Sequence, residues 1–119
     1  IILSVTMIFP DGDPEKIRKN MKEFTNHRKN TQPSALYNAG SVFKNGEDYF
    51  AAELIENAGL KGYKIDGVRV SEKHSNFFIA DKDAKSSALY KLVNFVKDSI
   101  FDKYDVMLQE EIIFVGDFS

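Results

Sequence analysis

Residues 63–79 have the sequence YKIDGVRVSEKHSNFFI, in which apolar runs alternate with polar turn residues. β-Branched and aromatic residues dominate the apolar runs and Gly67 marks a turn, so the stretch predicts short β-strands. The connections within residues 40–79 are too short for repeated parallel crossovers, which need about a dozen residues or more. The stretch therefore favours an α+β two-layer domain, with helices on one face of a small mixed or antiparallel sheet.

Helical patterns flank this stretch on both sides. Before it, a short helix that ends at Gly59 as a left-handed cap is predicted from apolar residues at Phe50, Leu54, Ile55 and Ala58. After it, residues 84–104 carry apolar side chains at the i, i+3, i+4 and i+7 positions of an amphipathic helix. These apolar positions are Leu89, Leu92, Val93, Val96 and Ile100. A last strand is expected over residues 106–115.

The first part of the chain has a strand pattern followed by a helix pattern. Residues 1–9 (IILSVTMIF) are mostly β-branched or large apolar residues and precede a Pro-Asp-Gly turn signal, which predicts a buried strand. Asp13 followed by Pro14 is typical of a capped helix start. The helix is expected to lie on the surface, with a narrow apolar stripe at Ile17, Met21 and Phe24.

Composition excludes several classes of function. The 119 residues fit one domain. Because the sequence begins at Ile1 and not at a methionine, residues 1–119 are interpreted as one domain of a larger protein. Sixteen basic and eighteen acidic residues, with no basic groove, argue against a nucleic-acid partner. The absence of cysteine excludes disulfides and is compatible with a reducing cytoplasm. The sequence has no apolar run near the ~18 residues that a membrane span needs.

Residues 38–45 (NAGSVFKN) lie outside any regular apolar pattern. Taken alone, Gly40-Ser41 fits an ordinary turn that leads into a strand as well as a site for chemistry. Three further motifs come after it in order, at residues 52–63 (AELIENAGLKGY), 70–77 (VSEKHSNF) and 108–116 (LQEEIIFVG). Their order and spacing make the four motifs together more specific than the glycine-serine pair.

Over nearly the whole chain, these motifs closely resemble the C-terminal substrate-binding domain of UDP-N-acetylenolpyruvoylglucosamine reductase (MurB, UDP-N-acetylmuramate dehydrogenase). The resemblance implies one domain of a cytoplasmic, FAD-dependent, NADPH-consuming bacterial reductase. Its substrate would be UDP-N-acetylglucosamine enolpyruvate, which is reduced to UDP-N-acetylmuramate in peptidoglycan biosynthesis. Hydride from reduced FAD adds to the enolpyruvyl group, and a proton must then reach the carbon beside the carboxylate.

The resemblance also assigns roles to individual residues. Ser41 is expected to be the general acid, and Glu111 the glutamate that holds and polarises the enolpyruvyl group. The register of the last motif selects Glu111 over the adjacent Glu110. Lys44 is either a source of positive potential or a solvated lysine at a strand end. Asn45 either shapes a turn with the following glycine, through positive backbone angles, or contacts the substrate.

Gly40, His74 and Asn76 complete the set of predicted substrate-binding residues. A lone histidine before an apolar strand is more often structural or exposed, which is the alternative for His74. Tyr63 more simply packs the short helix onto the sheet than lines a pocket. The chain has two histidines and no carboxylate pair at ligand spacing, so no metal site is expected.

The FAD-binding domain of the family and its catalytic arginine have no counterpart in these residues. FAD and NADPH are therefore expected to bind mainly to an N-terminal domain of the same protein, and this chain alone is expected to be inactive. The competing interpretation is a non-catalytic α+β module that binds a uridine nucleotide or a protein. The presence of both Ser41 and Glu111 favours the enzyme.

Overall fold

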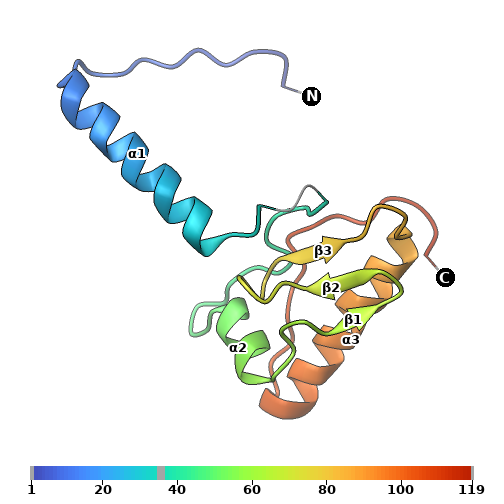
Figure 1. The fold of residues 1–119 in the computed structure, drawn as a ribbon. Helices are drawn as coiled ribbons and strands as arrows, with labels where there is room; N and C mark the ends of the chain where they lie inside the picture. The colour runs from blue at the N-terminus through green and yellow to red at the C-terminus, as the bar shows by residue number, and fades with distance from the viewer. Residues whose placement is uncertain (1, 35–36, 119) are drawn as a thin grey trace. The chain divides into compact units, whose positions relative to one another are not determined.

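The computed structural model describes residues 2–34 and 37–118 and divides into two compact units, Ile1–Asn30 and Thr31–Ser119. Figure 1 shows the elements in their chain order. They are α1 (Pro14–Thr31), α2 (Ala51–Asn57), β1 (Lys64–Ile65), β2 (Val68–Val70), β3 (Phe78–Ala80) and α3 (Ser86–Tyr104). Among the described residues, none of these helices has the length and apolarity needed to cross a membrane.

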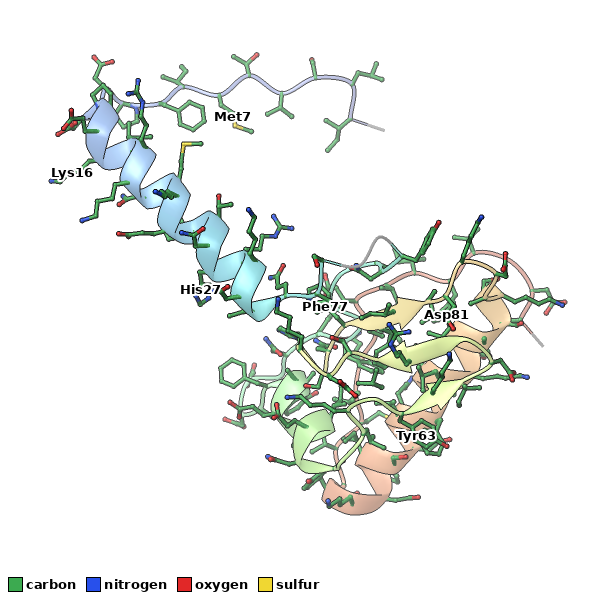
Figure 2. All side chains as sticks on the ribbon, viewed as in Figure 1. Met7, Lys16, His27, Tyr63, Phe77 and Asp81 are labelled. Atoms are coloured by element: carbon green, nitrogen blue, oxygen red, sulfur yellow. The ribbon has the colours of Figure 1, made fainter. Side chains whose placement is uncertain are left out.

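The N-terminal segment corrects the prediction of a buried strand over residues 1–9. Residues 2–9 belong to no strand and are exposed, while residue 1 lies outside the described residues. Met7, labelled on this segment in Figure 2, is 66% exposed. A strand needs a neighbouring strand for its backbone N–H and C=O groups, and the described residues of the first unit contain none.

Helix α1 begins as predicted. The Oδ1 atom of Asp13 accepts hydrogen bonds from the backbone N–H groups of Glu15 (2.9 Å) and Lys16 (3.4 Å), which confirms the side-chain cap. None of the helix is buried, and the exposed residues include its apolar stripe, Ile17, Met21 and Phe24.

The sheet of the second unit has three antiparallel strands in the order β1-β2-β3. A two-residue turn joins β1 to β2, with Asp66 at φ 44° and Gly67 at φ 89°. Two successive residues with positive φ are typical of the type I′ turn, whose twist matches that of the flanking strands. The structure thus confirms the predicted turn at Gly67 and the predicted short strands.

Helix α3 covers one face of this sheet and contacts both β1 and β2 (Figure 1). Four residues of the predicted stripe are buried, namely Leu92, Val93, Val96 and Ile100. Leu89 of that stripe is only half-buried, and Ala88 is buried in addition. They share a core with Ile55 of α2 and with apolar residues of the sheet, including Val68, Val70 and Phe78. The α+β class is therefore confirmed, with an antiparallel sheet.

The sequence predicts the end of α2 correctly but not the segment after α3. Gly59 ends α2 as expected, because its N–H donates to Glu56 O (2.9 Å) and the next N–H, of Leu60, donates to Ile55 O (3.2 Å). The strand predicted over residues 106–115 is wrong. This stretch contains only an isolated bridge at Glu110, because the backbone bends at the next two residues and leaves the pairing.

Candidate functional site

Residues 40–45, here called the serine segment, lie between two other parts of the chain. On one side, Ser41 forms an antiparallel bridge with Phe77, and the N–H of Val42 donates to Asn76 O (2.9 Å). These bonds attach the segment to the loop that precedes β3. The sheet therefore fixes the position of the backbone at Ser41.

On its other side, the serine segment pairs with the stretch after α3. The N–H of Lys44 donates to Gln109 O, and the N–H of Glu111 donates to Val42 O, each at 2.8 Å. Glu111 therefore bonds the residue directly after Ser41, although most of the domain separates them in sequence. The structure brings together the backbones that carry the predicted acid and the predicted glutamate.

The side chains of Ser41 and Glu111 are both exposed, whereas Val42 and Phe43, which follow Ser41 in the chain, are 2% and 1% exposed. Among the described residues, neither the Ser41 hydroxyl nor the Glu111 carboxylate has a hydrogen-bond or ion-pair partner. The buried pair anchors the segment in the core. The two polar groups remain available to a ligand.

Asn76 is buried, with 4% exposure, and its side-chain amide is committed to Phe43. Its Oδ1 atom accepts from Phe43 N–H (2.9 Å), and its Nδ2 group donates to Phe43 O (2.8 Å). The prediction of substrate binding did not include this structural role. The signal in the sequence is an amide directly before the apolar run that enters β3, where an unpaired polar group would be costly.

Gly40 also has a conformational role. Its φ is +81°, and its N–H donates to Asn38 Oδ1 (3.1 Å), which forms a local side-chain turn before the serine. A Cβ atom at this position would have no neighbour within 4 Å, so the backbone angle rather than space favours glycine.

At the other end of the segment, Lys44 is exposed and Asn45 caps a helix. The Oδ1 atom of Asn45 accepts from the N–H of Ala51, the first residue of α2, at 3.1 Å. The expected positive backbone angles at Asn45 and Gly46 are absent. Gly46 instead leaves room for the ring of Tyr49, which a Cβ atom would overlap.

His74 is half-buried, and its ring is held in place. Its Nδ1 atom accepts from Asn76 N–H (3.3 Å), and its ring meets Phe77 edge-on, with 4.7 Å between centroids. Burial lowers the pKa of His74, and the charge of the nearby Lys61 lowers it further. A backbone hydrogen bond and the Glu56 charge raise this pKa, but the net shift is downward. The imidazole is therefore neutral at pH 7, with its proton on Nε2 because Nδ1 is an acceptor.

The two adjacent glutamates have different surroundings. Glu110 accepts a hydrogen bond from Lys97 of α3 at 2.7 Å, and both side chains are less than one-third exposed. Burial alone raises the pKa of Glu110, but the Lys97 hydrogen bond, a backbone hydrogen bond and the Lys97 charge together hold it below its ordinary value. Glu111 remains exposed, and its selection over Glu110 as the catalytic glutamate stays a prediction.

Tyr63 stacks on Phe95 of α3, with 4.3 Å between ring centroids, so it packs against the long helix rather than the short one.

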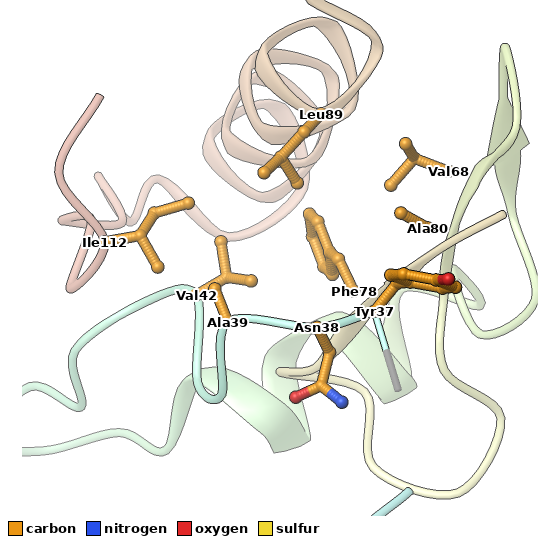
Figure 3. A pocket seen from close by; sticks show the side chains of 9 residues that line it. All are labelled: Tyr37, Asn38, Ala39, Val42, Val68, Phe78, Ala80, Leu89 and Ile112. Atoms are coloured by element: carbon orange, nitrogen blue, oxygen red, sulfur yellow. The ribbon is translucent and has the colours of Figure 1, made fainter. Parts of the chain in front are cut away.

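A separate apolar pocket of about 200 Å³ lies between β2, β3, α3 and the start of the serine segment. Figure 3 shows Phe78 in its middle, and the amide of Asn38 pointing away from the apolar side chains. None of the predicted site residues lines it.

Among residues 2–34 and 37–118, no cluster of three or more histidine or carboxylate side chains is placed to hold a metal ion. The geometry instead offers the exposed hydroxyl of Ser41 and the exposed carboxylate of Glu111, carried on two backbone segments that pair with each other. A hydroxyl can donate a proton, and a carboxylate can accept hydrogen bonds from a ligand.

Comparison with known proteins identifies similar chains. Residues 32–115 match the model of a family described as UDP-N-acetylenolpyruvoylglucosamine reductase, C-terminal domain. The UDP-N-acetylenolpyruvoylglucosamine reductase of Clostridium tetani is 38% identical over 98% of this chain, and that of Caldicellulosiruptor bescii is 40% identical over 99%. The chain spans 38% of the length of each of these relatives.

A solved structure shows the same similarity in three dimensions. The crystal structure of UDP-N-acetylenolpyruvylglucosamine reductase (MurB) from Thermus caldophilus superposes with a TM-score of 0.69 and 31% sequence identity. The match covers 82% of this chain and 34% of that one.

Proposed function

Because this chain belongs to the UDP-N-acetylenolpyruvoylglucosamine reductase family, we propose that it provides the substrate-binding domain of such a reductase. In this proposal the full-length enzyme uses FAD and NADPH to reduce UDP-N-acetylglucosamine enolpyruvate to UDP-N-acetylmuramate. The substrate-binding domain was expected over residues 1–119; because the family model matches residues 32–115, we propose that the domain lies in this part and that the residues before it lead to an N-terminal FAD-binding domain. The resulting sugar nucleotide serves peptidoglycan biosynthesis.

The backbone pairing at the serine segment is the observation that carries the proposal. The hydrogen bond from Glu111 N–H to Val42 O fixes the glutamate beside the residue directly after Ser41. Both side chains are exposed on this anchored backbone. A proton donor and a carboxylate that act on the same three-carbon group need this proximity.

In the proposed reaction the Ser41 hydroxyl supplies the proton. Its O–H bond breaks as a C–H bond forms at the carbon beside the substrate carboxylate, where the carbanionic intermediate carries its charge. Glu111 holds and polarises the enolpyruvyl group. Lys44 and the Nε2–H group of His74 are the cation and the neutral donor that this side of the chain offers to anionic parts of the substrate.

The described residues do not fit a flavin pyrophosphate. Such a site needs closely spaced glycines that offer backbone N–H groups, commonly just before a helix. The close pair here, Gly59 and Gly62, comes after α2, and Lys85 directly precedes α3. We therefore assign FAD and NADPH to the N-terminal domain and derive no step of this chain through them.

The N-terminal unit offers a surface for that domain. The apolar residues Leu3, Val5, Met7 and Phe9 precede α1, and each is at least 64% exposed. The apolar stripe of α1 is also exposed. The relatives align with this part of the chain as well and are longer than it, so we propose that the N-terminal FAD-binding domain covers these apolar residues.

The test uses the full-length reductase that contains this chain, under anaerobic stopped-flow conditions. Ser41→Ala should leave flavin reduction by NADPH nearly unchanged and slow flavin reoxidation by the enolpyruvyl substrate by about 10²-fold to 10⁴-fold. Ser87→Ala, an exposed serine in the first turn of α3, is the matched control. Equal slowing of both half-reactions would indicate a damaged fold, and an unchanged reoxidation rate would refute the role of Ser41.

A further inference from the structure

Asn76 makes three hydrogen bonds to the two residues directly after Ser41. Its backbone carbonyl accepts from Val42 N–H, and its side chain bonds both the N–H and the C=O of Phe43. The amide therefore takes the place of a strand residue, which would exchange both of its backbone bonds with its partner. The described residues supply no other bond to the Phe43 backbone.

The loop that carries Asn76 is itself anchored. The Ser75 hydroxyl donates to Ala52 O of α2, and the Ser71 hydroxyl accepts from the N–H groups of Lys73 and His74. Ser71 and Ser75 are each 1% exposed. A buried, bonded loop of this kind can hold a neighbouring segment at a fixed distance.

We propose that Asn76 is a positioning residue that holds the Ser41 hydroxyl in place through the backbone of Phe43. This inference rests on the proposed function and replaces the predicted role of Asn76 as a substrate ligand. Asn76 is 4% exposed and both ends of its amide bond Phe43, so a substrate would have to break these bonds to bind the amide. A displacement of about 1 Å at a reacting group can cost roughly 10²-fold in rate.

An amide supplies both the acceptor and the donor that bond the Phe43 backbone. A carboxylate accepts from the Phe43 N–H but has no proton for its C=O, and an apolar side chain satisfies neither group. The proposal therefore predicts different outcomes for Asn76→Leu and Asn76→Asp. Asn57, at the exposed end of α2, provides the matched control Asn57→Leu.

The first experiment measures both half-reactions of the full-length reductase and the affinity for its enolpyruvyl substrate. Asn76→Leu should slow flavin reoxidation by about 10²-fold, while flavin reduction and substrate affinity stay close to those of Asn57→Leu. Amide hydrogen exchange should accelerate at Phe43 in Asn76→Leu. A loss of substrate affinity as large as the loss of rate would overturn the proposal and restore Asn76 as a ligand.

Asn76→Asp keeps one of the two bonds and tests the proposal if the leucine variant fails to fold. Burial raises the pKa of the new carboxyl group, and its protonated form regains a donor for Phe43 O. The reoxidation rate of this variant relative to wild type should therefore rise as the pH falls. A ratio that does not change with pH would overturn the proposal.

The Ser41→Ala result separates this inference from the proposed function. If Ser41→Ala slows reoxidation and neither Asn76 variant does, only the positioning role is refuted. If Ser41→Ala leaves reoxidation unchanged, the proposed function and the positioning role are both refuted.

Discussion

Replacing Asn45 by alanine should destabilise the domain through the start of α2. This helix has only seven residues, and its N-cap residue, Phe50, provides no side-chain hydrogen bond. Asn45 supplies the missing acceptor, because its Oδ1 atom lies 3.1 Å from the N–H of Ala51, a residue with 0% exposure. Loss of a side-chain cap costs about 1 kcal/mol, and a buried donor without a partner costs about 1–3 kcal/mol.

Thermal unfolding monitored by circular dichroism can measure this effect. Asn45→Ala should lower the Tm by about 4–24 °C, given a cost of about 1–3 kcal/mol and roughly 4–8 °C per kcal/mol for a domain of this size. Asn45→Asp should stay near the wild-type Tm, because a carboxylate accepts the same bond and favours the positive end of a helix. Asn57→Ala, at the exposed end of the same helix, is the control. Equal Tm values for Asn45→Ala and Asn57→Ala would refute the cap.

Three further predictions concern charge, backbone conformation and cofactor. Lys97→Met should lower the free energy of unfolding by about 0.5–1 kcal/mol near pH 7. Lys97 holds the pKa of Glu110 low, so the difference in unfolding free energy between wild type and variant should be largest above the pKa of an unfolded glutamate, about 4.3. Urea titrations at several pH values should show this difference shrinking as the pH falls below that pKa. Gly67→Ala should cost about 1–3 kcal/mol in thermal unfolding, because φ is +89° and its Cβ would lie 3.2 Å from Ala84 Cβ. The chain mixed with FAD should show no flavin absorbance after desalting, and stoichiometric yellow protein would contradict the division between the two domains.

The sequence predicted the elements whose interactions are local. Helix α3 is predictable from its apolar spacing, the end of α2 from Gly59, and the β1-β2 turn from Gly67, since each depends on residues close together in the chain. The strand predictions at residues 1–9 and 106–115 failed for a different reason. An apolar run shows that a segment can pair, but the partner and the length of the pairing depend on distant residues.

For the candidate site, too, the sequence identified some residues, whereas the roles of others are visible only in the structure. Motif resemblance selected Ser41 and Glu111, and the structure places both on neighbouring, exposed positions. The same approach missed the structural roles of Asn45 and Asn76, because a polar residue in a motif is interpreted first as a ligand. Only the three-dimensional structure shows that each amide bonds the backbone of another segment.

The bridge between Phe43 and Glu110 has a consequence for how the site assembles during folding. The two residues are separated by more than half of the chain, so this contact requires a long loop to close and is among the slowest kinds to form. During synthesis from the N-terminus, α2, the β-strands and α3 can all form before residues 109–111 are available. The pairing beside Ser41 would then form last, so a newly made chain would have its helices and sheet in place before the catalytic residues are positioned.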